Sequence, residues 1–458
     1  MNAPVTTAEL LPELKPLKFE DLAHIPGPEP TFFRTWRTIR FLRDPRGTVN
    51  RLAATYGPVF RRQDNFGWGV TLLGPEANEL VLFNKDRIFS SRLGWNPVLE
   101  RLFPNGLMLM DFDEHRMHRR TLSVAFKPAP MKAYLEGLND GIARTLAGWP
   151  ADRPMRFYPA IKELTLDLAA GSFLGEPWGP EAREINRAFM DMVLAAVAVV
   201  RRPLPFTQMR RGVRGRAFMC AYFAREIPKR RGIQRDDIFT HICNATHEDG
   251  RTLTDQEIID HMNFLMMAAH DTLTSSLTSL VYFLGRHPDW QERLRAEVDA
   301  VRARHGDRLP DAALPELEEC EMAFKEALRL IPPVPMIPRR AIRDFEFMGY
   351  RIPAGAGVGV NPMYTHMMPE HWPEPQKFDP ERFTPQKSAN RHKYAWVPFG
   401  GGAHMCLGLH FAYMQAKCFL FHLLGARRIE LAPGYEADFA MVPIPRPRDG
   451  LPVTLRHR

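Results

Sequence analysis

One cysteine in a glycine-rich segment is the residue of this sequence best suited to metal chemistry. Residues 399–408 read FGGGAHMCLG, so three consecutive glycines precede Cys406. Consecutive glycines form no regular element and let the backbone approach a flat or crowded group. Cys406 then begins an apolar stretch that predicts a helix, where the helix dipole and free N–H groups favour the metal-binding thiolate. Gly408 leaves room for such N–H groups to reach the sulfur, whereas the ordinary alternative is a buried structural cysteine.

An acid beside an alcohol is the second candidate for chemistry. Residues 264–274 read FLMMAAHDTLT, so Asp271 and Thr272 interrupt an apolar run. Polar groups without partners are costly to bury. The pair therefore indicates either a site that handles protons or a stripe of the helix that faces solvent. His270 could donate to a substrate or pack against a neighbouring helix, and the pattern favours neither.

Arginines form the third group of candidates. Glu326 and Arg329 are three residues apart on a predicted helix and can pair on one face, although a solvated ion pair is the simpler reading. Planar guanidinium groups also suit carboxylates geometrically, with surface solvation as the alternative for each. Further candidates of this kind are Arg119, with His115 one turn before it, Arg339, its neighbour Arg340, and Arg382.

Helices must position most of these residues. Thr254 and Glu257 match a capping box, and the apolar periodicity that follows predicts a helix of about 30 residues that ends near Gly285. A second helix is predicted over Leu317–Leu330, and a third over Leu407–Leu424 with Gly425 as its C-cap. The predicted strands cover residues 58–61, 69–73, 345–352 and 358–360, with a last strand pair at 441–455.

Composition narrows the class of protein. The chain has 458 residues, of which 45% are hydrophobic and 25% charged, as in ordinary globular proteins. The formal net charge of +8 comes without a basic run or a nucleic-acid motif, so we expect an acidic protein partner and no nucleic acid. Five scattered cysteines indicate a reducing compartment. We find no signal peptide and no apolar run of ~20 residues, and therefore expect a cytoplasmic protein without an integral membrane segment.

The cysteine segment resembles that of the cytochrome P450 family, whose pattern is Phe-x-x-Gly-x-Arg/His-x-Cys-x-Gly. The residues in register are Phe399, Gly402, His404, Cys406 and Gly408, with Ala412 as the small residue one turn later. The resemblance implies a mainly α fold with small β-sheets, in which haem b lies between a long central helix and the loop and helix that carry the cysteine. It also implies one domain over residues 1–458, with 1–25 as a flexible arm and no fused reductase domain.

The same resemblance assigns roles to the other candidates. Cys406 would be the axial ligand of the iron, and Glu326 and Arg329 would form a structural network with Arg382. Ala268, Asp271 and Thr272 match the segment over the iron, although Ala269 stands where the family has glycine. The residues implied in binding the haem propionates are His115, Arg119 and Arg339, with Arg340 as the competitor of Arg339.

The implied activity is monooxygenation of a small apolar substrate. Dioxygen would be the oxidant, Asp271 and Thr272 would deliver protons, and electrons would come from a separate ferredoxin or flavodoxin. The apolar segments 93–107, 189–200 and 441–444 favour a terpenoid, steroid or fatty-acid-like substrate. The alternatives are a peroxygenase or isomerase with the same haem, a haem protein that is not an enzyme, and a non-haem metal protein.

Overall fold

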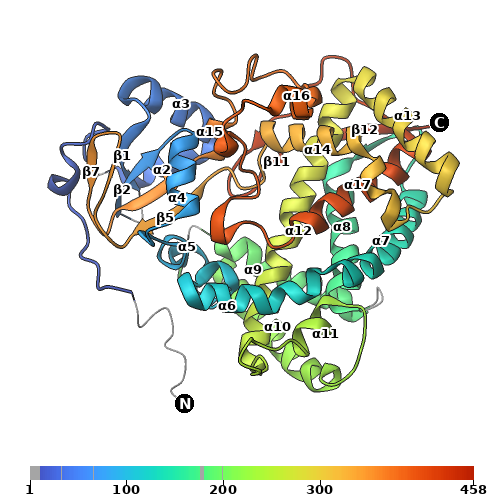
Figure 1. Ribbon diagram of the computed structural model, residues 1–458, viewed down its shortest axis with the longest axis horizontal. Coiled ribbons are helices and arrows are strands. Elements are labelled where there is room, and N and C mark those ends of the chain that lie inside the picture. The colour runs from blue at the N-terminus through green and yellow to red at the C-terminus, as the bar shows by residue number, and fades with distance from the viewer. Residues whose placement is uncertain (1–10, 32, 65–66, 176–179, 199) are drawn as a thin grey trace.

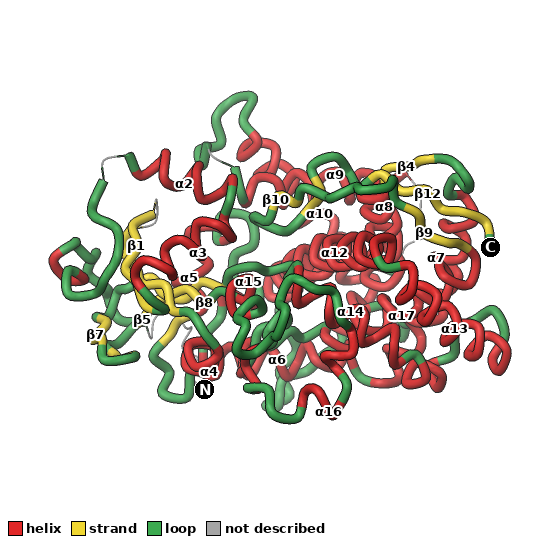
Figure 2. Tube along the Cα trace, turned by 90° about the horizontal axis from the view of Figure 1, so that it is seen from above, coloured by secondary structure: helices red, strands yellow, loops and turns green. Residues whose placement is uncertain are grey.

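Helices form most of the protein, and small sheets lie at its two ends (Figures 1 and 2). The computed structural model describes all residues except 1–10, 32, 65–66, 176–179 and 199. The longer helices are α2 (Arg34–Arg43), α3 (Pro45–Tyr56), α4 (Pro75–Phe83), α5 (Ser91–Leu99), α6 (Phe112–Leu122), α7 (Pro128–Gly148), α8 (Phe157–Ala169), α9 (Pro180–Ala196), α10 (Gln208–Arg230), α12 (Asp255–Arg286), α13 (Pro288–His305), α14 (Glu318–Leu330) and α17 (Leu409–Ala426). The short helices are α11 (Ile238–Cys243), α15 (Pro362–Thr365) and α16 (Pro385–Ser388). The mainly α fold with small sheets is confirmed.

The longest described helix, α12, runs through the centre of the helical part (Figure 2). Its capping box is formed as predicted: the Thr254 side chain accepts from the Glu257 N–H, and the Glu257 side chain accepts from the Thr254 N–H. The helix ends at Arg286, and Pro288 begins the next helix at a position where its missing N–H costs nothing. A helix of 32 residues gives the site a rigid wall.

Two sheets join segments that are far apart in the sequence. The five-stranded sheet has the order β1 (Val59–Asp64), β2 (Gly67–Leu72), β8 (Gly357–Val360), β5 (Ile337–Ala341) and β3 (Phe89–Ser90). The three-stranded sheet has the order β4 (Pro154–Arg156), β12 (Pro452–His457) and β9 (Arg427–Glu430). Two hairpins pair β6 (Phe345–Phe347) with β7 (Tyr350–Ile352) and β10 (Phe439–Ala440) with β11 (Arg446–Pro447). Because Arg339 and Arg340 are successive residues of β5, their side chains leave on opposite faces.

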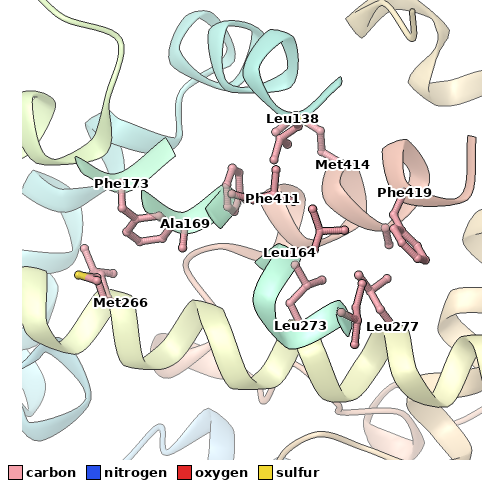
Figure 3. Packing of buried hydrophobic residues seen from close by; sticks show 14 of the residues in the cluster. Leu138, Leu164, Ala169, Phe173, Met266, Leu273, Leu277, Phe411, Met414 and Phe419 are labelled. Atoms are coloured by element: carbon pink, nitrogen blue, oxygen red, sulfur yellow. The ribbon is translucent and has the colours of Figure 1, made fainter. Parts of the chain in front are cut away.

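One apolar core ties α12 to the helix after the cysteine segment. Figure 3 shows Leu164 of α8 between Leu273 of α12 and the start of α17, where Phe411 and Met414 lie. Almost every side chain of α17 from 414 to 424 is buried, as expected of a helix that is apolar on all sides. Each such leucine or phenylalanine contributes about 1.5–3 kcal/mol through burial, so the cysteine segment is anchored firmly.

Two observations bear on the predicted boundaries. The assignment of Gly425 as a C-cap is wrong, because α17 continues to Ala426 and Gly425 instead lets the Arg302 guanidinium approach its backbone. In the predicted N-terminal arm, Leu22 and Ile25 are fully buried against the larger sheet, so this part of the arm is packed.

Within the described residues, no helix is both long and apolar enough to cross a membrane.

Candidate functional site

The loop before α17 has a shape that depends on its glycines. Gly400 and Gly402 adopt left-handed φ angles of 71° and 62°, which other residues avoid. A Cβ atom on Gly402 would lie 2.1 Å from the carbonyl oxygen of Leu82, so the loop also packs too closely for a side chain there. The N–H of Cys406 donates to the Phe399 carbonyl at 2.9 Å and closes the loop. Phe399 itself packs against the Tyr413 ring.

The Cys406 thiol is accessible and also closely surrounded by protein. Its surface is accessible, yet surrounding protein desolvates the sulfur, and this burial raises the pKa of the thiol. The Gly408 N–H, which donates to the sulfur, and the Arg119 charge oppose the rise in pKa. The free N–H group thus favours the thiolate as expected, but desolvation outweighs both effects in the pKa of the thiol. In the first turn of α17, the Ala412 N–H donates to the Gly408 carbonyl at 2.9 Å.

Two histidines and two arginines meet beside this thiol. The rings of His115 from α6 and His404 from the cysteine loop lie 3.8 Å apart between centroids. Burial lowers the pKa of His115 to about 3, with Arg119 and Arg339 adding to the effect, and lowers the pKa of His404 well below its usual value. Both rings are therefore neutral near pH 7 and can donate N–H groups to an anion.

Burial dominates the electrostatics of the two arginines in this cluster. Burial lowers the pKa of Arg339 to about 10 and also lowers that of Arg119. The negative charge of Asp111 raises the pKa of Arg339, but burial outweighs this effect. Burying a cation is costly unless anions compensate it. The donor set, two arginines and two neutral histidines beside a thiol, thus fits a group with two carboxylates and a metal, as haem b has.

Arg340 lies outside this cluster. Its guanidinium donates to the Gly355 carbonyl at 3.2 Å, and its charge acts on Arg62. Arg339, in contrast, influences the pKa of both His115 and His404. The structure therefore places Arg339, and not Arg340, among the residues that could contact a propionate.

The middle of α12 exposes a short stretch of small side chains. Most of the helix is buried, but Met267, Ala268, Ala269 and Thr272 keep part of their surface accessible. The Thr272 hydroxyl donates to the Ala268 carbonyl at 2.7 Å, and the helix continues through Ala269 without interruption. Ala268 and Ala269 pack against the same large apolar core that contains Phe411 and Met414 at the start of α17.

Asp271 is held as an anion by groups that no local motif predicts. Lys162 Nζ of α8 and His270 Nδ1 both lie 3.2 Å from the Asp271 Oδ1 atom. Burial raises the pKa of Asp271, but His270 and Lys162 outweigh it and lower the pKa to about 2. His270 also packs against Phe189 of α9 and has its Nε2 atom 3.3 Å from the Lys162 carbonyl. His270 therefore contacts neighbouring helices. Packing of this kind is one of the two roles that the sequence left open for His270.

The Glu326–Arg329 pair is fully buried. Two nitrogens of Arg329 donate to the two carboxylate oxygens at 2.7 and 2.8 Å, and Arg382 Nε lies 3.3 Å from Glu326 Oε1. The remaining donors of Arg329 bind the carbonyl oxygens of His366, Pro375 and Lys377. The three predicted residues thus form one network that fixes the segment leading to the cysteine loop.

Comparisons with known proteins agree with this geometry. The sequence model of the cytochrome P450 family matches residues 26–440. A putative cytochrome P450 136 of Mycobacterium tuberculosis is 39% identical over 92% of this chain and 86% of its own. A taxane 10-beta-hydroxylase of Taxus cuspidata is 26% identical over 86% of this chain and 81% of its own. A retinoic acid-bound cyanobacterial CYP120A1 superposes with a TM-score of 0.84 and 31% identity, over 92% of this chain and 96% of that one.

Proposed function

This chain belongs to the cytochrome P450 family of haem-b monooxygenases, and we propose that it hydroxylates a large apolar molecule of the terpenoid, steroid or fatty-acid type. The observation that carries the proposal is the accessible stretch of small side chains on α12. Ala268 and Ala269 offer apolar surface between buried neighbours, Phe264–Met266 before them and His270 and Asp271 after them. Retinoic acid and taxanes, named for two of the relatives, are themselves large and mainly apolar.

The segments over this stretch support an apolar substrate. Gly106, at the end of the predicted segment 93–107, packs directly on Phe264 of α12. Phe189 of α9 packs on His270, so a second predicted segment also lies over α12. Arg201 does not supply a free charge there, because it donates to the carbonyl oxygens of Pro97, Val98 and Ala196 and so joins α9 to α5.

The experiment is a substrate screen on the purified haem-loaded protein. Terpenoids, steroids and fatty acids are titrated while the spin state of the iron is followed by absorption. Compounds that bind are then incubated with dioxygen and a ferredoxin or flavodoxin reducing system. A hydroxylated product from an apolar ligand supports the proposal, whereas spin shifts confined to small polar compounds contradict it.

We assign the Cys406 sulfur as the iron ligand and the surrounding cations as the groups that hold the propionates. Haem b, when bound, supplies the iron that activates dioxygen. Arg119 and Arg339 would donate to the carboxylates, and the neutral rings of His115 and His404 would add N–H donors. Support for this assignment comes from the burial of Arg339 and from its electrostatic coupling to both histidines.

Replacing Arg339 by methionine is expected to weaken haem retention. The change removes charge-assisted hydrogen bonds worth about 1.5–3 kcal/mol, so haem transfer to apomyoglobin should become roughly 10- to 100-fold more favourable. The matched control is Arg340→Met, the adjacent residue on the opposite face of β5. Equal effects of the two substitutions, or a larger effect at Arg340, would contradict the assignment.

We assign proton delivery to Asp271 and Thr272. The Asp271 carboxylate, ionised by Lys162 and His270, can accept a proton from solvent and pass it inwards. The Thr272 hydroxyl keeps an oxygen lone pair free while it donates to the Ala268 carbonyl, so it can receive and orient a water molecule next to the accessible stretch.

The Thr272→Ala variant is expected to consume dioxygen without hydroxylating substrate. A positioned proton donor contributes about 10² or more to a rate, so product formation should fall by that order while peroxide accumulates. The two products are measured together per molecule of reductant. Thr278→Ala is the control, since Thr278 makes the same contact with the carbonyl four residues earlier in a buried part of α12. Unchanged coupling would favour the peroxygenase or isomerase alternative.

We propose that electrons arrive from an acidic ferredoxin or flavodoxin at the surface next to the cysteine loop. Phe126, just after α6, packs against Phe411 of α17, so this surface adjoins the loop. Its exposed basic residues are Arg116, Arg120, Lys127 and Lys132. Arg116 and Arg120 are partly neutralised by Asp113 and Glu248, which leaves the two lysines as the main attraction for an acidic partner.

All five cysteines are free thiols, as we expect for a protein of the cytoplasm.

A further inference from the structure

A cluster of histidines lies where α6 meets the beginning of α12. His118 belongs to α6, His247 to the turn before α12, and Glu257 and His261 to the first two turns of α12. One possible ligand atom each from His118, His247 and Glu257 lies within 4.8 Å of the others. The side chains of His118 and His247 are only 3% and 4% exposed, and His261 is completely buried. Neither the monooxygenase reaction nor haem binding uses these residues.

The hydrogen bonds around His247 leave one ring nitrogen free to bind a metal. The Thr121 hydroxyl donates its single proton to the Met117 carbonyl at 3.1 Å. Its oxygen therefore accepts from the Nδ1–H of His247, which lies 2.8 Å away. The Nε2 atom of His247 is then the unprotonated nitrogen, and this buried atom has no hydrogen-bond partner among the described residues. A buried acceptor without a partner is costly, unless a ligand binds there.

His118 is oriented in the same way by a second neighbour. Its Nδ1 atom lies 2.9 Å from Nε2 of His261, and its Nε2 atom lies 3.8 Å from Glu257 Oε1. Burial lowers the pKa of all three histidines.

Glu257 offers one carboxylate oxygen to the cluster. Its Oε2 atom accepts from the Thr254 N–H and hydroxyl in the capping box, whereas Oε1 is the atom near His118. Arg251 lies 3.2 Å from both oxygens and keeps the carboxylate ionised. Its positive charge also opposes a second cation, so we expect a moderate affinity rather than a very tight one.

We propose that His118, His247 and Glu257 bind a divalent ion of the zinc type. Two imidazoles and one carboxylate form a known zinc ligand set with an open fourth position. Hydrogen bonds from His247 Nδ1–H to Thr121 Oγ1 and from His118 Nδ1–H to His261 Nε2 supply the outer contacts that zinc-binding histidines normally have. Tetrahedral zinc would bring the ligand atoms to about 3.3 Å from one another, a small contraction from the present distances.

The site would join three segments of the chain. A metal held by α6, the turn at His247 and α12 would fasten α6 to the beginning of the long helix. The turn is already shaped for this role, since His247 N–H donates to the Arg251 carbonyl at 2.8 Å and an isolated bridge pairs Thr246 with Thr252. Because α6 also carries His115 and Arg119, the metal would stabilise the wall of the haem site without contacting haem.

The experiment measures zinc binding to the haem-loaded, metal-stripped protein. Zinc is titrated in competition with a chromophoric chelator, and Tm is recorded with and without zinc. We expect one zinc ion per chain and a higher Tm. His247→Asn should weaken zinc binding on the order of 100-fold or more, and Thr121→Val, which removes only an outer contact, by roughly 10- to 100-fold.

The matched control is the exposed His305–Glu316 pair, whose atoms approach to 2.8 Å on the surface. His305→Asn should leave zinc affinity and the zinc-dependent rise in Tm unchanged. The Soret band of each variant shows that the fold and the haem site are intact. Zinc that binds equally well to wild type and to His247→Asn, or a wild type that takes up no stoichiometric zinc, would overturn the proposal and leave a neutral hydrogen-bonded cluster.

Discussion

The Cys406→Ala variant is expected to lose the strongly red-shifted Soret band of the reduced protein under carbon monoxide, together with all hydroxylation. Both properties depend on a sulfur ligand, whose electron donation to the iron favours O–O cleavage. The loop around Cys406 is held by its backbone hydrogen bond to Phe399 and by the close contact of Gly402 with Leu82, neither of which uses the thiol. The substitution should therefore remove the ligand and leave the fold intact.

Haem should still bind to this variant, although more weakly, because Arg119, Arg339 and the two histidines remain. The measurement is the carbon monoxide difference spectrum, combined with the far-ultraviolet circular dichroism spectrum to check the fold. Cys418→Ala is the matched control, since Cys418 is a free, buried thiol on the helix that follows the loop. A red-shifted band in Cys406→Ala, or its loss in Cys418→Ala, would show that another residue ligates the iron.

Features with a local cause could be predicted from the sequence. The beginning of α12 follows from the capping box of Thr254 and Glu257, and its length follows from the apolar periodicity. The Gly408 N–H reaches the Cys406 sulfur because both residues lie in one short loop. The Glu326–Arg329 pair forms because three residues along a helix share a face.

Features caused by tertiary contacts could not be predicted in this way. Lys162 of α8 contacts Asp271 although it lies more than a hundred residues earlier in the chain. No sequence motif indicates this contact. The raised pKa of Cys406 comes from burial by the whole fold, which outweighs the local donors that the sequence reveals. Gly425 looks like a helix stop in the sequence, yet its lack of a side chain admits Arg302 from α13. In each case the decisive neighbour is distant in sequence.

Arg329→Ala is expected to destabilise the protein more than any other single substitution considered for this network. Both Arg329 and Glu326 have completely buried side chains, and the arginine makes two bonds to the carboxylate and three to carbonyl oxygens. Removing it leaves the buried Glu326 carboxylate with only Arg382 and the Asp379 N–H as partners, and takes the arginine donors away from three carbonyl groups. Breaking a buried ion pair in this manner costs about 3–5 kcal/mol, a large part of the stability of an ordinary protein.

Arg329→Lys and Glu326→Gln separate charge from geometry in this prediction. The lysine keeps one positive charge but cannot supply the forked donors, and the glutamine keeps the shape but leaves Arg329 and Arg382 without an anion. We therefore expect both variants to lose stability and haem content, measured by urea unfolding and by the ratio of Soret to protein absorbance. Arg304→Ala, which breaks an exposed pair with Glu316, should cost no more than about 1 kcal/mol. Arg329→Lys could instead match wild type in both measurements. That result would show that a single buried charge is enough, and that the hydrogen bonds from Arg329 to the carbonyl oxygens do not hold the segment before the cysteine loop.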